Sequence, residues 1–254
     1  MQLLLCRDPD EKARGTRALD LSADPGAAQA IDEPAGIPGR PDRPVQVAHT
    51  QLKQRSVSSP LGRATLLHAL AHIELNAIDL ALDICWRFSG LPDAFYRQWL
   101  GVAREEALHF ELLRDHLATL GHAYGDFAAH DGLWQMARRT RHDLLARLAL
   151  VPRTLEARGL DASPRVRAKL LAAGDARGAE IIDIILRDEI GHVSVGNHWY
   201  RWLCAQRGLD PVRLYPQLAE RFEAPRLRGP FNLQARRAAG FDEAELAALA
   251  TIGS

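Results

Sequence analysis

Apolar side chains recur at three- and four-residue steps along four long stretches of the chain, which is the pattern of helices with one buried face. These stretches cover residues 62–88, 92–121, 133–158 and 175–208. No stretch alternates apolar and polar residues in the way that predicts a strand. Shorter helices are expected over "DPDEKARGTRAL" near the beginning and "FDEAELAALA" near the end. The pattern therefore predicts an all-α protein built on a four-helix bundle.

The expected helices carry residues that commonly start, stop or bend a helix. Pro92 suits the first turn of the second helix, and Gly121 suits its end. Asp175 can cap the fourth helix, and Ser163–Pro164 has the form of a cap and first residue of a separate short helix. Pro152 should kink the third helix, because proline lacks a backbone donor and crowds the carbonyl four residues before it.

The pattern changes at two points and divides the chain into three regions. Residues 1–60 contain several prolines and no apolar periodicity, so we expect an extended N-terminal arm with one short helix. A flexible linker is the alternative for this region. Residues 61–208 contain the predicted bundle, and residues 209–254 are expected to form a C-terminal extension of one or two short helices packed on it.

One glutamate lies in the apolar stripe of each of the four long helices. In chain order they are Glu74, Glu106, Glu156 and Glu189. In the second and fourth helices a histidine follows three residues later, at His109 and His192, and residues three apart project from the same face of a helix. The chain thus repeats the order Glu, then Glu-x-x-His, which predicts two helix pairs related by an approximate twofold axis.

Four buried carboxylates need positive charge, because an unpaired buried carboxylate costs several kcal/mol. Two divalent cations would neutralise them, and oxygen-rich ligands with one imidazole per metal suit iron or manganese. A single Glu-x-x-His is more often a surface salt bridge, but six such residues on four inward stripes favour a metal centre. Glu156 is the least firmly placed of the six, because the expected kink at Pro152 changes the direction in which its helix faces.

Two acidic residues lie next to the expected ligands. A metal-bound imidazole usually donates its second N–H to a carboxylate or carbonyl. Asp188 and Glu105 point away from the histidine on their own helix, so each is expected to support the histidine of the other helix: Asp188 that of His109, and Glu105 that of His192.

A second polar series follows another face of the first helix at three- and four-residue steps. Its members are His68, His72, Asn76, Asp79 and Asp83. We expect these side chains to contact the N-terminal arm or solvent and not a metal.

Composition narrows the class of protein further. The 254 residues include 32 basic and 32 acidic side chains, and this balance does not favour a nucleic-acid surface. The three cysteines are far apart in the chain and indicate neither a disulfide framework nor a thiolate zinc site. No apolar run approaches the ~20 residues that a membrane span needs, so a cytoplasmic protein without a membrane segment is expected.

Several segments together resemble the ferritin-like superfamily, and more closely an uncharacterised bacterial family within it, known as a domain of unknown function. They include "GRATLLHALAHIELNAIDLALD", "AREEALHFELL", "RDEIGHV" and "GPFNLQARRAAGF". The resemblance covers nearly everything from residue 40 onward. The doubled Glu-x-x-His is also similar to di-iron oxygenases and ribonucleotide reductase radical subunits, and more distantly to a bacterial tRNA hydroxylase. The resemblance implies a ferritin-like four-helix bundle whose metal ligands are the six residues given above, the four glutamates and two histidines of the long helices.

The expected function is that of a dinuclear metal carboxylate protein with two iron ions, or manganese or a mixed pair. An oxidoreductase or hydroxylase that activates O₂ is the leading hypothesis, with an unidentified small-molecule substrate and electron donor. Two alternatives are a ferroxidase, peroxide-removing or iron- and manganese-handling protein, and a non-catalytic binding module stabilised by metal. Nucleic acid is not favoured as a partner, although a tRNA substrate stays open as a variant of the first hypothesis. The protein could also form a homodimer.

Overall fold

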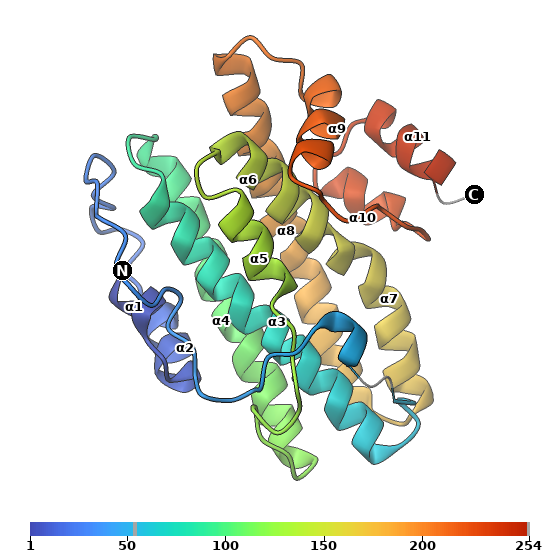
Figure 1. Ribbon diagram of the computed structural model, residues 1–254. Coiled ribbons are helices and arrows are strands. Elements are labelled where there is room, and N and C mark those ends of the chain that lie inside the picture. Colours follow the sequence, from blue (N-terminus) through green and yellow to red (C-terminus); the bar gives the residue numbers. More distant parts are fainter. Residues whose placement is uncertain (53–54, 253–254) are drawn as a thin grey trace. The chain divides into compact units, whose positions relative to one another are not determined.

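The computed structural model describes residues 1–52 and 55–252, and the regular structure in these ranges is helical (Figure 1). Apart from one isolated bridge between Gln46 and Ala129, no strand occurs among these residues. The all-α class is confirmed, and the packing of the helices is consistent with a bundle. Within the described part of the chain, no helix is long and apolar enough to span a bilayer.

The chain forms two compact units. The first comprises Met1–Trp134 and Ala168–Ile181, and the second comprises Gln135–Arg167 and Ile182–Ser254. Three helices contribute residues to both units: α5 (Gly132–Arg139), α7 (Ala157–Ala172) and α8 (Ala176–Gln206). The ferritin-like relation that we expect between the two helix pairs concerns the placement of these units and stays a prediction.

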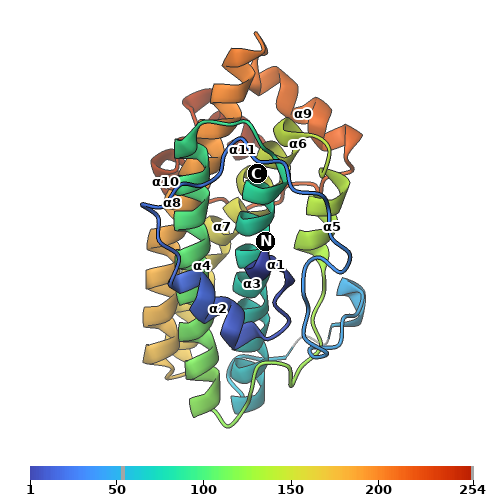
Figure 2. The ribbon, with the colours of Figure 1, turned by 90° about the vertical axis from the view of Figure 1, so that its left-hand side faces the viewer.

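Two long helices, α3 (Pro60–Arg87) and α4 (Asp93–Thr119), run side by side in the first unit (Figures 1 and 2). The Ser59 hydroxyl caps α3 by accepting a hydrogen bond from the Gly62 N–H at 3.0 Å, and Pro60 occupies the first turn. Pro92 lies one residue before α4, and Gly121 follows its end with a positive φ of 77°. The structure therefore confirms these two helices and the end signal at Gly121, whereas Pro92 lies at the N-cap of α4 and not in its first turn.

The N-terminal arm contains α1 (Gln2–Leu5), α2 (Pro9–Arg17) and the 3₁₀ helix η1 (His49–Gln51). Helix α2 is the short helix that the sequence predicts, and it packs against α4 and α3. Its Lys12 ammonium donates to Asp79 Oδ1 on α3 at 2.5 Å, and the Arg40 guanidinium donates to Asn76 Oδ1 at 3.3 Å. The second polar face of α3 thus binds the arm at Asn76 and Asp79, as expected.

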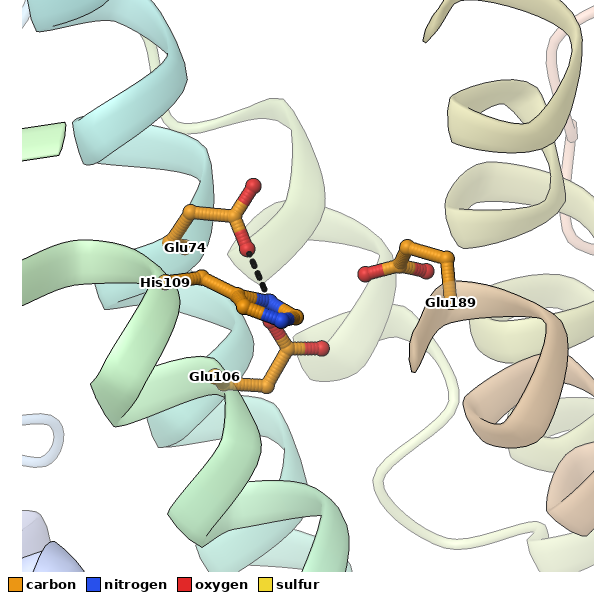
Figure 3. Close-up of side chains that lie close together, drawn as sticks. All are labelled: Glu74, Glu106, His109 and Glu189. Carbon is orange, nitrogen blue, oxygen red and sulfur yellow. Dashed lines mark hydrogen bonds and ion pairs between the residues drawn. The ribbon is translucent and has the colours of Figure 1, made fainter. Parts of the chain in front are cut away.

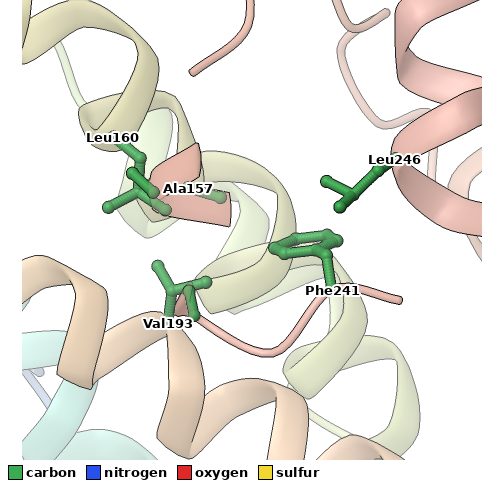
Figure 4. Close-up of a cluster of buried hydrophobic side chains, with 7 residues drawn as sticks. Ala157, Leu160, Val193, Phe241 and Leu246 are labelled. Carbon is green, nitrogen blue, oxygen red and sulfur yellow. The ribbon is translucent and has the colours of Figure 1, made fainter. Parts of the chain in front are cut away.

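The second unit is built from α6 (Leu144–Leu150), the π-helix η2 (Val151–Glu156) and most of α7 and α8. Three helices follow where one or two were expected: α9 (Pro211–Arg221), α10 (Leu233–Ala238) and α11 (Glu243–Ile252). Phe241 and Leu246 pack with Ala157, Leu160 and Val193 in one buried apolar cluster (Figure 4). Helices α10 and α11 are therefore anchored on α7 and α8 through apolar side chains, whereas α9 packs against α6.

The predicted third helix, over residues 133–158, is wrong in its limits. Helix α5 ends at Arg139, and a new helix begins at Leu144 with the Asp143 carboxylate accepting from the Ala146 N–H at 3.0 Å. At the other end, the sequence predicts a stop at residue 158 and a new short helix at Ser163. Instead, α7 continues without interruption through Pro164 to Ala172. Proline frees the carbonyl four residues before it, and Asn232 Nδ2 donates to that Leu160 carbonyl at 3.2 Å. The C-terminal segment thus supplies the hydrogen bond that Pro164 removes.

The expected kink at Pro152 takes the form of the π-helix η2. The wider turn leaves backbone carbonyls without their usual partners, and the Thr154 hydroxyl donates to the Ala149 carbonyl, five residues earlier, at 2.8 Å. Such short π segments inside α-helices are frequent at functional sites. Glu156 is the last residue of η2.

Candidate metal centre

Three of the six predicted ligands meet in the first unit. Glu74 projects from α3, and Glu106 and His109 project from one face of α4 (Figure 3). All three are buried, with exposed fractions of 4%, 0% and 0%. The spacing of three residues places Glu106 beside His109, and the packing of α3 against α4 brings Glu74 to them.

The imidazole of His109 lies between the two carboxylates. Its Nδ1 is 3.3 Å from Glu74 Oε2 and 3.4 Å from Glu106 Oε2. The atoms that these three residues offer to a metal lie within 4.8 Å of one another. One imidazole and two carboxylates at such distances form a partial coordination shell for a cation.

The electrostatics of this group are unfavourable without added positive charge. Burial, and secondly the negative charge of Glu106, raise the pKa of Glu74 well above its usual range, while His109 acts in the opposite direction. A proton or a cation must therefore compensate the carboxylates. A divalent cation would do so while binding both of them at once.

The fourth predicted helix contributes its residues in the second unit. Glu189 and His192 are three residues apart on α8, both are buried, and His192 Nδ1 lies 3.4 Å from Glu189 Oε1. Glu74, Glu106, His109 and Glu189 make up a buried set of side chains that could hold a metal ion (Figure 3). Glu156 is half-buried at the end of η2. The participation of Glu156 and His192 as ligands stays a prediction.

The two acids expected to support the histidines differ in their surroundings. Glu105 is exposed on α4. Asp188 is largely buried on α8, where the neighbouring Arg187 donates to it at 2.7 Å. The expected pairs, Asp188 with His109 and Glu105 with His192, would each join the two units and stay predictions.

The polar face of α3 is bound by the loop after α4 as well as by the arm. The Gly125 N–H donates to His68 Nε2 at 2.9 Å, and the Tyr124 hydroxyl lies 2.8 Å from His72 Nδ1. Burial lowers the pKa of His68 to about 4 and that of His72 to about 3, so both imidazoles are neutral. These contacts give the series a structural role in the first unit.

Sequence reasoning missed several buried cations, among them Lys12 and Arg153. Lys12 belongs to the arm, and Arg153 lies in η2, where its side chain is 2% exposed. The partner of Lys12 is Asp79, 67 residues away in the chain, and that of Arg153 is Glu245, 92 residues away. No local sequence pattern connects residues so far apart. Only the tertiary contacts reveal them.

Comparison with known proteins places the chain in a family. The family model described as "Protein of unknown function (DUF455)" matches residues 5–247. The chain belongs to this family. An uncharacterised protein of Haemophilus influenzae is 49% identical over 213 residues, which is 81% of this chain and 74% of the relative. No solved structure is significantly similar to the chain.

Membership of DUF455 confirms the expected resemblance to an uncharacterised bacterial family. The wider ferritin-like assignment rests on the repeated Glu-x-x-His and the helical architecture, so it belongs to the proposal that follows.

Proposed function

We propose that this DUF455 protein is a ferritin-like, dinuclear metal carboxylate protein that acts as an O₂-dependent oxidoreductase. Two iron ions are the proposed metals, with manganese or a mixed pair as the alternative. The proposed ligands are Glu74, Glu106, His109, Glu156, Glu189 and His192. The observation that carries the proposal is the buried group of Glu74, Glu106 and His109, whose carboxylates need a compensating proton or cation.

The donor set fits such a metal pair chemically. Carboxylate oxygens with one imidazole for each ion suit iron or manganese, whereas a site for soft metals would contain thiolates. Four carboxylates carry four negative charges, which two divalent cations would neutralise. Glu-x-x-His from each of two helices, with one glutamate from each of two others, is the ligand set of the di-iron and di-manganese carboxylate bundles.

The protein would hold the ions and control access to them. When bound, the metal pair would supply the electrons that reduce O₂, and the protein would fix its geometry and exclude water. Phe110 and Leu113 follow His109 on the buried side of α4, and both are fully buried. These side chains provide the apolar surroundings that shelter a reactive centre from solvent.

The proposed partners are a small-molecule substrate and an electron donor. The formal net charge of zero gives no general attraction for nucleic acid, so a tRNA substrate is a less favoured variant of the same proposal.

Metal analysis and oxygen consumption test the proposal together. The protein is purified without added metal and its metals are quantified; the metal-free form is then loaded anaerobically with ferrous iron and exposed to O₂ with a reductant. The expected result is about two ions per chain and sustained O₂ consumption that the Glu106→Gln and His109→Gln variants lack.

Other outcomes separate the alternatives. Uptake of many ions per chain would favour storage or ferroxidase activity, whereas metal-dependent folding without redox chemistry would favour a metal-stabilised binding module. A folded wild-type protein that binds neither iron nor manganese would refute the metal centre itself.

A further inference from the structure

Arg153 occupies an unusual position in the second unit. It lies in the π-helix η2, three residues before the proposed ligand Glu156, and only 3% of the residue is exposed. A buried guanidinium keeps its charge, so its partners must compensate for the lost solvent. Those partners come from α8 and from the C-terminal segment.

The first partner connects η2 to α8. Arg153 Nε donates to Asn197 Oδ1 at 2.5 Å, and Asn197 Nδ2 donates to the Ala239 carbonyl at 2.7 Å. The Pro152 ring packs directly against the α8 backbone at the neighbouring residue, because a Cβ atom at Gly196 would lie 2.5 Å from Pro152 Cβ. η2 and α8 therefore touch at adjacent residues, 152–153 against 196–197.

The second partner is an acid on the last described helix. Arg153 Nη2 donates to Glu245 Oε1 on α11. The other oxygen of Glu245 accepts from Arg201 at 2.6 Å and from the Asp242 N–H at 2.9 Å. The Glu245 side chain is 10% exposed, so this ion pair is weakly screened by solvent. Docking of α11 thus supplies the negative charge that buried Arg153 requires.

Aromatic rings complete the environment of the guanidinium. Its carbon lies 4.6 Å from the ring centroid of Tyr200, 5.1 Å from that of Phe241 and 5.5 Å from that of Tyr215. Tyr200 belongs to α8, Phe241 to the loop that precedes α11, and Tyr215 to α9. Attraction between the cation and the faces of these rings adds to the ion pair and gathers the C-terminal segment around η2.

We propose that Arg153 is a positioning residue through which Glu245 of α11 holds η2, and with it Glu156, in the geometry that binds metal. The inference rests on the proposed function, because Glu156 is a proposed ligand. It follows that docking of the C-terminal helix controls the metal affinity of the centre, although α11 contributes none of the proposed ligands. Partners that orient a metal ligand commonly change metal affinity by about 10- to 100-fold when they are removed.

Manganese binding tests this inference. The free Mn²⁺ concentration is measured by electron paramagnetic resonance during titration of the wild-type protein, the Glu245→Ala variant and the Glu243→Ala variant. Glu243 is the matched control, because it also lies on α11 and forms an ion pair, with Arg237 of α10 at 2.6 Å, but its side chain is 74% exposed. We expect Glu245→Ala to weaken Mn²⁺ binding by about 10-fold or more and Glu243→Ala to leave it unchanged.

The readout distinguishes positioning from simple stabilisation. Far-ultraviolet circular dichroism confirms that each variant is folded at the temperature of the titration. A Glu245→Ala protein that melts at a lower temperature but binds Mn²⁺ as tightly as the wild type would overturn the inference. If Glu245→Ala does not fold, Glu245→Gln, which keeps the side-chain size but removes the charge, is judged by the same criterion. A wild-type protein that binds no metal would refute the proposed function instead.

Discussion

Buried ionisable side chains are concentrated on α3 and α4, and each has a definable energetic consequence. Glu74 and Glu106 are both buried beside His109, so the metal-free protein contains charges that oppose one another. His68 is buried against Tyr124, with the two rings stacked at 5.2 Å, and is kept neutral by its surroundings. We therefore expect Glu74 and Glu106 to destabilise the metal-free protein, and a bound cation to remove this cost. We expect His68 to make the protein less stable in acid.

Replacing Glu106 by Gln should separate stability from metal binding. The substitution removes a charge that raises the pKa of Glu74, so the metal-free protein should become more stable, by about 1 kcal/mol. Stabilisation by Mn²⁺ should disappear in the same variant. Urea unfolding with and without Mn²⁺ measures both effects, and Glu111→Gln, on the partly exposed side of α4, is the control. A less stable metal-free variant that still gains stability from Mn²⁺ would contradict this account.

His68 should make the protein less stable in mild acid. Burial lowers the folded-state pKa of His68 to about 4, whereas the unfolded chain titrates near the ordinary value of 6.5. Between these values only the unfolded state takes up the proton, so the contribution of His68 is fully present above about 6.5 and is lost as pH falls toward 4.

The Glu74 carboxyl responds to pH in the opposite direction, so the His68→Gln variant isolates the histidine. Glutamine can still accept the Gly125 N–H. Relative to this variant, the wild type should lose up to about 1.4 kcal/mol of unfolding free energy per pH unit below 6.5. Unfolding in urea at several pH values measures the difference, and identical slopes for the two proteins would show that His68 is not the titrating group.

At the scale of the elements, two contacts hold neighbouring segments together: that of η2 with α8, and that of α2 with α3. The approach of η2 to α8 depends on Gly196, and the attachment of α2 to α3 depends on the buried ion pair of Lys12 with Asp79. Both contacts join segments that are distant in the sequence. Each can be tested against a control substitution on the same element.

Alanine at Gly196 should be destabilising, although alanine usually favours a helix. Its Cβ would lie 2.5 Å from Pro152 Cβ, and overpacking of this kind costs about 1–3 kcal/mol. Gly191 lies on the same helix with no atom within 4 Å of an added Cβ, so Gly191→Ala should be neutral or stabilising by about 0.5–1 kcal/mol. Thermal unfolding of the two variants should move in opposite directions, and equal effects would argue against close contact between η2 and α8.

Removing Lys12 should strand a buried carboxylate. Burial already raises the pKa of Asp79 to about 6 against the effect of Lys12, and loss of the ammonium would raise it further. At pH 8 the Lys12→Met variant should lose about 3–5 kcal/mol, and the Lys12→Met/Asp79→Leu double variant should recover most of it.

Arg7 provides the control for this cycle, because its ion pair with Asp42 is exposed and lies in the same arm. Arg7→Met should change the free energy of unfolding by less than about 1 kcal/mol. If Lys12→Met behaved like this control, the arm would not depend on the buried pair.

At the scale of the whole molecule, the proposed ligands are divided between two units. Glu74, Glu106 and His109 belong to the first, and Glu156, Glu189 and His192 belong to the second. Metal binding at the proposed centre would therefore link the stability of the helices that carry these ligands.

Hydrogen exchange tests this link. Addition of Mn²⁺ should slow amide exchange in α4 of the first unit and in α8 around Glu189 of the second, to a degree that rises with Mn²⁺ concentration. Protection confined to α3 and α4 would show that the ion is held by the first unit alone. Chelation should reverse the protection and lower the melting temperature.

The local pattern of the chain was sufficient for the helical class and for part of the candidate site. Periodicity located α3, α4 and α8, and the spacing of three residues placed Glu106 beside His109 and Glu189 beside His192, because both features depend only on helix geometry. The burial of Glu74 also followed from its place in an apolar stripe. Pro164 misled the prediction because its consequence depends on Asn232, 68 residues later in the chain.

By itself, then, the sequence determined what a single helix determines: which residues share a face, and where the long helices α3, α4 and α8 begin and end. The tertiary structure decided which buried charges have partners, as for Lys12 with Asp79 and Arg153 with Glu245. It also decided that η2 and α7 carry the chain through two prolines that would otherwise end a helix. The reason is physical: these outcomes depend on desolvation and on hydrogen bonds between distant segments, which no local pattern contains.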